Sequence, residues 1–556
     1  MAMRVPQTGL ASMMKDGSSH MSGMEEAVFR NIKACRELFE VVQTSLGPNG
    51  MNKMIINHLE KLFVTNDAAT IIRELEVEHP AAKLLVLAAQ HQEQELGDGT
   101  NLVLTFAGEL LDQATELLKM GLHPSEIISG YDKACVKALS ELEENLVAYK
   151  MKDCRDTEEV VKALRTVLAS KQYGYEDMLA KVVADACVEI LPKNPKNFNV
   201  DNIRVVKIPG ASVHETTMVK GMVVRRSPEG NITSVSKAKV AVFACPMDAG
   251  KTETKGTVLL KNADDLLKFS GEEESRLDQC IKEIAEAGTN VVVAGSSVSD
   301  LAVHYLEKYN IMTVRVQSKF DLRRMCKVIG ATALARLGAP TPEEFGYCDS
   351  VKTKEFGDQL TTVFVQDESA TQLATIIIRG ATTNILDDVE RAVDDAVNVF
   401  KQITRDGRFV AGAGATEIEL ARRIMMFGET CPGLDQYAIK NYASAFEAIP
   451  RTLATNAGAD STELVSKLYA SHKAGGQNMG FDIEGLIKGD LIDAKDAFIL
   501  DHLKVKSWAI KLATNAATTV LSIDQIIMAK QAGGPRMPKN AADQDPDDDV
   551  ENPNMM

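Results

Sequence analysis

The turn at residues 97–101 carries the side chains best suited to phosphate chemistry in this chain. It reads Gly97-Asp98-Gly99-Thr100-Asn101 and lies between two long stretches of helical pattern, residues 80–95 and 100–119. Bare glycine backbone lets phosphate oxygens come close, and the Asp98 carboxylate is a ligand type that Mg²⁺ prefers. Thr100 opens the second helical stretch, where free N–H groups and the helix dipole favour an anion. Asp and Gly are also common in ordinary loops, so the meaning of this turn depends on its neighbours.

Two segments with related chemistry lie upstream of that turn. Thr44-Ser45-Leu46-Gly47-Pro48-Asn49-Gly50 closes an amphipathic helix. Strand-like runs follow at 54–56 and 62–65, and the second leads into Asn66-Asp67-Ala68-Ala69-Thr70. Each segment alone also fits a hairpin with a capping glycine, but together with Asp98 they predict a phosphate loop, a water-handling carboxylate and a metal ligand. The apolar face of the helix is formed by Val28, Ile32, Cys35, Phe39 and Val42.

The order of these motifs resembles the ATP site of group II chaperonins. The resemblance covers about residues 22 to 530 and keeps the order of motifs throughout. Three features indicate one particular subunit type of the eukaryotic cytosolic chaperonin: Ala68 where the family usually has Gly, Asn101 after the Thr, and Gly533-Gly534-Pro535. The matching motifs are Leu46-Gly47-Pro48, Asn66-Asp67, Gly97-Asp98-Gly99-Thr100, Gly121-Leu122-His123-Pro124, Ala169-Ser170-Lys171, Glu390 to Ala396, Gly412 to Glu417, Glu447 to Arg451 and Asn456-Ala457-Gly458.

The resemblance implies roles for the residues that would handle the terminal phosphate. Asp98 would hold Mg²⁺, and Asp67 and Asp395 would be the catalytic residues that orient and polarise the attacking water. Ser170 and Lys171 would belong to the nucleotide-sensing loop, with the charge of Lys171 reporting the phosphate. From the residues alone, Asp395 would instead be assigned to a solvent-facing helix position and Lys171 to an ordinary surface.

The resemblance also implies a nucleoside site and contacts to the phosphates of ATP or ADP. The nucleoside would lie against Gly412 and Asp501, with Asp501 accepting from ribose hydroxyls, although Asp501 alone also fits a helix N-cap. His502 stands where the family usually has Pro, and Ala68 and Ala413 each replace a common Gly. A methyl group at either alanine could crowd the nucleotide or restrict the backbone. The remaining nucleotide contacts would come from Leu46, Gly47, Pro48, Gly99, Thr100 and Asn101.

The pattern of elements predicts an α+β multidomain fold. The chain is helical to about residue 150, mixes helices with short β-branched runs from about 200 to 380, and is helical again to 527. The resemblance implies a chaperonin fold, in which both helical ends form one equatorial domain and Pro246 to Glu274 forms a helical protrusion of the lid. The strand-like runs are 203–208, 222–224, 240–243, 291–293, 311–316, 363–365 and 375–378. The expected boundaries are 1–21 for an N-terminal extension, 22–150 and 405–530 for the mostly helical, discontinuous equatorial ATP-binding domain, 151–219 and 376–404 for a small intermediate domain, 220–375 for the α/β apical substrate-binding and lid domain, and 531–556 for a disordered acidic tail.

Composition argues against several other functions. A net charge of −16 over 556 residues argues against nucleic acid as a partner, and no segment approaches the ~20 apolar residues that span a membrane. Nine cysteines without a C-x-x-C pair suggest neither zinc nor a disulfide framework, and we expect a cytoplasmic protein. Gly250-Lys251-Thr252 is similar to a P-loop, but Cys245 stands where that motif needs glycine. Glu417 likewise occupies the third glycine position of a dinucleotide fingerprint.

The function implied by the resemblance is that of a subunit of an ATP-driven cytosolic chaperonin. Such a subunit is an ATP hydrolase with ATP/ADP and Mg²⁺ as cofactors, and it encloses and folds non-native proteins as its lid closes. Its partners would be homologous subunits in a double ring of eight-membered rings, unfolded clients such as actin-like or tubulin-like proteins, and possible co-chaperones. The departures at Ala68 and Ala413 leave one alternative open, a nucleotide-binding scaffold subunit with little turnover.

Overall fold

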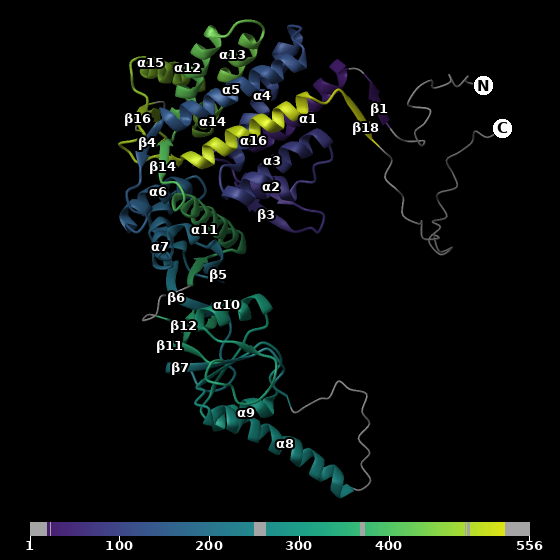
Figure 1. The fold of residues 1–556 in the computed structure, drawn as a ribbon, viewed down its shortest axis with the longest axis vertical. Coiled ribbons are helices and arrows are strands. Elements are labelled where there is room, and N and C mark those ends of the chain that lie inside the picture. Colours follow the sequence, from purple (N-terminus) through teal and green to yellow (C-terminus); the bar gives the residue numbers. More distant parts are fainter. Residues whose placement is uncertain are drawn as a thin grey trace, which may run out of the picture.

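Three blocks of structure follow one another along the long axis of the molecule (Figure 1). The computed structural model describes residues 19–22, 24–248, 263–366, 373–483, 485 and 490–528. The expected protrusion at 246–274 lies partly outside the described residues, and the N-terminal extension mostly so. The expected acidic tail at 531–556 lies wholly outside them.

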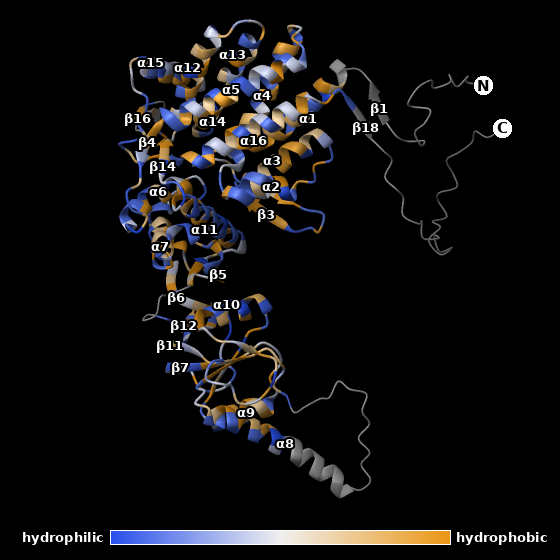
Figure 2. Ribbon diagram, viewed as in Figure 1, coloured by the Kyte–Doolittle hydropathy of each residue, from blue (hydrophilic) through white to orange (hydrophobic). Residues whose placement is uncertain are grey.

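The first block is helical and is built from both ends of the chain. Hydrophobic residues of both ends share one core, in which Phe106 stacks on Phe446 with ring centroids 4.4 Å apart. In Figure 2 the helices of this block carry hydrophobic and hydrophilic residues side by side, as expected for amphipathic helices. From the N-terminal part come α1 (Met24–Gln43), α2 (Ala68–Glu74), α3 (Pro80–Leu96), α4 (Thr100–Lys119) and α5 (Pro124–Glu144). From the C-terminal part come α12 (Ala415–Thr430), α13 (Asp435–Ala445), α14 (Ala448–Ala457), α15 (Ser461–Lys473) and α16 (Leu503–Leu521).

Several helices of this block were predicted correctly. All five apolar residues of the pattern between Val28 and Val42 are buried on α1, and both long helical stretches appear as α3 and α4. His79 caps the start of α3, where its ring accepts a hydrogen bond from the Ala81 amide, and Pro80 takes the first helical position. Gly97 ends α3 in the left-handed conformation, with φ of 80°.

Short strands join remote segments of the first block. In the sheet β17–β14–β4, the central strand β14 pairs antiparallel with one strand from each end of the chain. Strands of three or four residues leave little periodicity in a sequence, and of the short strands in this block only the two at 54–56 and 62–65 were predicted. The short strands are β1 (Ser19–Ser22) with β18 (Gln525–Met528), β2 (Lys53–Ile56) with β3 (Leu62–Thr65), β4 (Val147–Lys150), β14 (Arg408–Ala411), β17 (Leu500–His502), and β15 (Met479–Phe481) with β16 (Leu491–Asp493).

The second and third blocks share a nine-stranded sheet with the order β5-β13-β6-β12-β11-β7-β8-β9, and β10 pairs with β7. Every predicted strand-like run between residues 203 and 378 overlaps one of these strands, although the run 311–316 is one residue longer than β9 at each end. The helices α6, α7 and α11 pack against the β5 end of the sheet, α10 packs along its middle beside β6, β10 and β11, and α8 and α9 lie at the other end (Figure 1). The helices are α6 (Thr157–Ala169), α7 (Glu176–Glu189), α8 (Ala263–Glu286), α9 (Asp300–Lys308), α10 (Lys319–Ile329) and α11 (Thr383–Ile403). The strands are β5 (Ile203–Pro209), β6 (Thr217–Val224), β7 (Ser234–Phe243), β8 (Val291–Ala294), β9 (Met312–Arg315), β10 (Ala333–Leu334), β11 (Gly346–Phe356), β12 (Gln359–Val365) and β13 (Ala374–Gly380).

A buried ionic network fastens three helices of the first block. The Glu419 carboxylate on α12 accepts hydrogen bonds from Arg422 Nη2 at 2.6 Å and from Arg423 Nε at 2.7 Å. His472 Nδ1 on α15 lies 3.1 Å from the other Glu419 oxygen, and Arg423 also donates to Glu141 on α5. Burial alone would raise the pKa of Glu419, but the bonds from His472, Arg422 and Arg423 outweigh it and lower the pKa to about 2.

Replacing Glu419 by Gln should destabilise the helical block at neutral pH, and the loss should shrink in acid. The folded-state pKa lies below the ordinary 4.5, so the charged form stabilises the fold above pH 4.5 and this contribution fades as pH falls toward 2. The difference between the two values corresponds to a contribution on the order of 3 kcal/mol at pH 7. Urea unfolding followed by fluorescence of Trp508, the only tryptophan, would measure it at pH 7, 5 and 3. Glu463→Gln is the control, because its ion pair with Lys467 is exposed. A deficit in Glu419→Gln that does not change with pH would contradict the assignment.

Candidate functional site

A cavity of about 420 Å³ lies where the two ends of the chain meet in the first block. Its wall is built from the loop after α1, the α3–α4 turn, the loop after α6, and the segments around α12 and β17. The structure therefore brings together most residues that the sequence predicted for a nucleotide site. Those that line the cavity are Leu46, Gly47, Pro48, Asp98, Gly99, Thr100, Asn101, Ser170, Lys171 and Asp501.

The other three predicted residues lie directly behind this wall. Asp67 and Asp395 both pair with the cavity-lining Lys171. Gly412 lies against Asp501, since a Cβ added at Gly412 would stand 3.3 Å from Asp501 Oδ2. All three thus contact a lining residue or lie beside one.

Two helices begin at this cavity with N-termini that no side chain caps. Gly99 precedes α4 with φ of 81° and Gly414 precedes α12 with φ of 78°, and neither position has a side-chain hydrogen bond to the first turn. The first amide groups of a helix lack partners within the helix and carry its positive dipole end. Two such ends at one cavity form a site for an anion with several oxygens, such as a polyphosphate.

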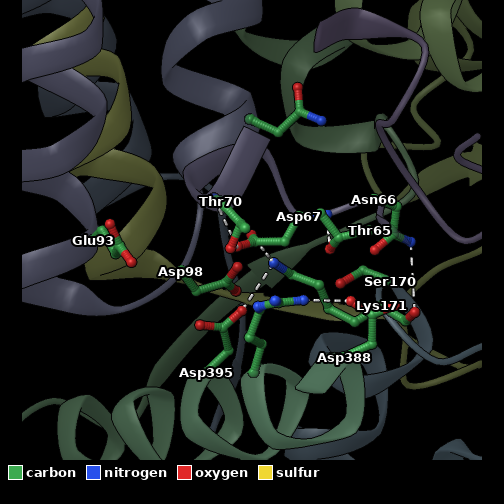
Figure 3. A network of polar contacts seen from close by, with 12 residues as sticks. Thr65, Asn66, Asp67, Thr70, Glu93, Asp98, Ser170, Lys171, Asp388 and Asp395 are labelled. Atoms are coloured by element: carbon green, nitrogen blue, oxygen red, sulfur yellow. Dashed lines mark hydrogen bonds and ion pairs between the residues drawn. The ribbon is translucent and has the colours of Figure 1, made fainter. Parts of the chain in front are cut away.

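Lys171 lies at the centre of a buried carboxylate cluster (Figure 3). Its ammonium forms ion pairs with Asp67 and, at 3.0 Å, with Asp395 Oδ2, and all three side chains are largely buried. Asp67 is also the N-cap of α2, where its Oδ2 accepts from Thr70 N at 3.1 Å and from Thr70 Oγ1 at 2.8 Å. Asp395 comes from the middle of α11, so one lysine connects the first block with the second.

The charges in this cluster follow from burial and from the shared lysine. Burial raises the pKa of Asp67, but Lys171 and Thr70 together lower it below its ordinary value, so Asp67 is anionic. Burial raises the pKa of Asp395 well above its usual range, because Lys171 does not offset both burial and the repulsion from Asp67 and Asp98. The pKa of Asp98 is raised by burial as well. For Lys171, burial lowers the pKa but the three carboxylates outweigh it, so Lys171 stays cationic.

The donor set fits Mg²⁺ bound together with phosphate better than a metal held by protein alone. Asp98 Oδ1 accepts from the Gly99 amide at 2.7 Å, which orients this carboxylate beside the N-terminus of α4. Among the described residues there is no group of three or more His, Cys, Asp and Glu side chains placed to hold a metal. Mg²⁺ is commonly held by one or two carboxylates plus substrate phosphates, and Asp98 beside the two helix N-termini provides that combination.

The cavity wall also contains apolar side chains and an ion triad that the sequence did not reveal. Lys506 Nζ lies 2.6 Å from Glu417 Oε1 and 2.8 Å from Asp501 Oδ2, and all three residues line the cavity. The position of Lys506 in the first turn of α16, five residues after Asp501, was the only sequence signal for it. The apolar wall is formed by Ile449, Leu453, Phe481, Ile483, Ile492 and Phe498.

The three departures from the family pattern are accommodated in different ways. Ala413 adopts φ of 53°, a left-handed conformation that disfavours a side chain, and its methyl lies beside Gly480. Ala68 is the first residue of α2 and is not among the residues with positive φ, so its backbone is unstrained. His502 is the N-cap residue of α16, which Asp501 therefore is not, and its Nε2 donates to the Asp406 carbonyl at 2.7 Å.

Two further expectations from the sequence, about membrane-spanning segments and about disulfide bonds, can also be compared with the structure. No helix among the described residues has the length and apolar character needed to cross a bilayer. None of the nine cysteines, all of which the structure describes, forms a disulfide bond.

Comparison with known proteins gives matches over nearly the whole chain. Residues 38–531 match the TCP-1/cpn60 chaperonin family. The chain is 58% identical over 548 residues to T-complex protein 1 subunit theta of Gallus gallus and 57% identical over 548 residues to that of Homo sapiens, covering 98% of this chain and 100% of each relative. It is 52% identical over 539 residues to a probable T-complex protein 1 subunit theta of Schizosaccharomyces pombe, covering 97% of this chain and 98% of that relative. Theta is the subunit type that Ala68, Asn101 and Gly533-Gly534-Pro535 indicated, so that prediction is confirmed.

Removing the Lys171 ammonium should destabilise the chain in the absence of nucleotide. Lys171→Met leaves Asp67 and Asp395 close together without their cation, and breaking a buried ion pair in this way costs about 3–5 kcal/mol. The double variant Lys171→Met with Asp67→Asn should recover part of the loss, because it removes one of the unpaired charges. The thermal unfolding midpoint of the full chain without nucleotide is the measurement, with Lys181→Met at an exposed position of α7 as control. Equal midpoints for Lys171→Met and the wild type would show that this cluster does not hold the two blocks together.

Proposed function

The chain belongs to the TCP-1/cpn60 chaperonin family, and from this premise we propose that it is an ATP hydrolase that drives protein folding. It binds ATP with Mg²⁺ in the cavity of the first block and hydrolyses it while non-native proteins are enclosed. Family membership makes the chain a chaperonin subunit, and the nucleotide chemistry rests on the cavity.

The observation that carries this proposal is the distribution of charge along the cavity. The wall has the uncapped N-termini of α4 and α12 and the Lys171 ammonium, all of which attract phosphate. It also has apolar side chains that fit a base, together with the Asp501 carboxylate, which can accept from ribose hydroxyls. A triphosphate and a nucleoside are therefore each matched by residues of this wall.

The residues of the chain take on separate parts of the reaction. Asp98 holds Mg²⁺, which when bound neutralises charge on the phosphate oxygens. The first amides of α4 and α12 hold those oxygens in place. Asp67 and Asp395 orient the attacking water, and Asp395, whose pKa is raised by burial, accepts its proton. The two carboxylates lie on different elements that Lys171 joins. The charge of Lys171 would also attract the terminal phosphate.

The same residues offer a physical route from the site to the rest of the molecule. Lys171 follows α6 and Asp395 lies on α11, and both helices belong to the second block. Any change in the position of Lys171 or Asp395 is thus carried by helices that also pack against the large sheet. We take the blocks to be the equatorial domain (22–150 and 405–530), the intermediate domain (151–219 and 376–404) and the apical domain (220–375) of a chaperonin subunit.

The same proposal extends to partners and location. Homologous subunits would form a double ring of eight-membered rings in the cytosol around unfolded clients of the actin or tubulin kind. Neither nucleic acid nor a membrane is part of this function.

A scaffold subunit with little turnover is the second candidate, and one observation favours it. Ala413 holds a side chain in left-handed backbone at the start of α12, where strain can displace the Gly414 amide from the phosphates. After incubation of the assembled complex with ATP, ADP at this subunit supports hydrolysis. ATP that persists there supports the scaffold.

Replacing Asp395 by Asn should slow hydrolysis while leaving ATP binding within about twofold of the wild type. The amide keeps the shape of the side chain and one acceptor oxygen but cannot take a proton from water. Loss of one group that stabilises the transition state slows a reaction by ~10²-fold or more. Neighbouring subunits could mask the effect, so the readout is the nucleotide found at this subunit in structures of the assembled complex after timed incubation. Asp394→Asn is the matched control, because Asp394 is the adjacent and more exposed carboxylate on α11. ADP forming as fast in Asp395→Asn as in the control would overturn the role of Asp395.

A further inference from the structure

We propose that Gln92 is a positioning residue for the turn that carries Asp98, and that its side-chain amide determines which way the peptide between Asp98 and Gly99 faces. This inference rests on the proposed function and deepens it, because it identifies what orients the groups assigned to Mg²⁺ and phosphate. Gln92 does not belong to the set of residues predicted for the site, and it does not line the cavity.

Gln92 is fully buried near the end of α3, where its side chain bonds to two backbone carbonyl groups. Its Nε2 donates to the Asp98 carbonyl at 2.9 Å and to the carbonyl of Val505, in the first turn of α16, at 3.2 Å. The main-chain carbonyl of Gln92 also accepts from the Gly97 amide, at 3.3 Å. One residue thus holds the turn through both its backbone and its side chain, and joins it to the C-terminal part of the chain.

The turn needs such a contact because its backbone does not select one conformation by itself. Gly99 has φ of 81°, and glycine populates positive and negative φ about equally. Rotating the Asp98–Gly99 peptide by half a turn would give Gly99 a negative φ, which glycine also allows. A side chain at residue 99 has no room, since its Cβ would stand 3.0 Å from Val505 Cγ1 and 3.1 Å from Gln92 Nε2. The choice between the two orientations is therefore left to hydrogen bonds.

The orientation of this peptide decides what lies beside the Asp98 carboxylate. In a trans peptide the C=O and N–H groups point in opposite directions, and no peptide bond among the described residues is cis. With the Asp98 carbonyl held by Gln92, the Gly99 N–H points the other way and donates to Asp98 Oδ1 at 2.7 Å. In the reversed peptide a carbonyl oxygen would take the place of that N–H. The carboxylate would lose the bond that orients it, and the oxygen would repel phosphate.

The buried amide of Gln92 fits in only one orientation. Both of its Nε2 partners are carbonyl oxygens, and its Oε1 is buried without a hydrogen-bond partner. Turning the amide over would place Oε1 against two carbonyl oxygens and would lose both bonds. A methionine of similar length removes the unpaired oxygen together with the two donors, so loss of the amide need not unfold the chain.

The test measures two properties of the full-length chain: the Mg²⁺ requirement for binding a non-hydrolysable ATP analogue, and hydrogen exchange in the turn without nucleotide. Gln92→Met should raise the Mg²⁺ concentration that half-saturates binding by about tenfold, because two hydrogen bonds no longer select the peptide orientation. Amides of residues 97–101 should exchange about tenfold faster than in the wild type. Gln94→Met is the matched control, since Gln94 is exposed on the same helix.

Each outcome decides the question. A raised Mg²⁺ requirement and faster exchange in folded Gln92→Met, with Gln94→Met like the wild type, support the inference. If either quantity is unchanged the inference is overturned, even where the thermal midpoint falls, because Gln92 then only joins α3 to α16. That result leaves the proposed function intact. A wild type that binds neither ATP nor the analogue overturns the proposed function and this inference with it. If Gln92→Met does not fold, Gln92→Glu decides alone by the same two measurements, because it keeps the shape of the side chain but lacks the amide N–H groups.

Discussion

A buried ammonium group needs carboxylates around it, and this requirement determines which segments of the chain meet at two places in the cavity wall. Lys171 is enclosed by carboxylates from the start of α2 and the middle of α11, and Lys506 by carboxylates from α12 and β17. In each case at least one carboxylate is remote in sequence, Asp395 from Lys171 and Glu417 from Lys506, so the charge is fully satisfied only when the chain has closed on itself. These two clusters and the sheet β17–β14–β4 bring remote segments of the chain together around the cavity.

The two lysines differ in what they hold together. Lys506 acts within the first block, where α12 and α16 share a core with α4 and α5. Lys171 follows α6 in the second block, where α6 and α11 pack at the β5 end of the large sheet, and it reaches across to Asp67 in the first block. The position of the Lys506 cluster is thus set within one core, whereas the position of the Lys171 cluster depends on how two blocks lie relative to each other. A ligand that contacts both clusters therefore connects the first block to the second.

The parts of the fold that were predicted are those in which a regular pattern is long enough to be recognised. α1, α3 and α4 repeat apolar residues over several turns, and the strands between residues 203 and 378 are β-branched runs. The strands β4, β14 and β17 were missed, because they are only three or four residues long and their partners lie about ninety or more positions away in the sequence. The same reason hid Glu417 and Lys506, whose pairing exists only in the closed chain. Asp395 was identified from a motif alone, since nothing local distinguishes it from Asp394.

The contact between Ala413 and Gly480 constrains how this sequence can change over time. A Cβ added at residue 480 would stand 2.8 Å from the Ala413 methyl and 2.9 Å from the Ala413 carbonyl oxygen, closer than such atoms can approach. Because that oxygen belongs to the backbone, replacing Ala413 by glycine would not make room for a larger residue at 480. Position 480 is therefore confined to glycine whether alanine or glycine stands at 413, whereas position 413 can exchange one for the other while 480 stays as it is. Freedom to change is thus unequal on the two sides of this contact.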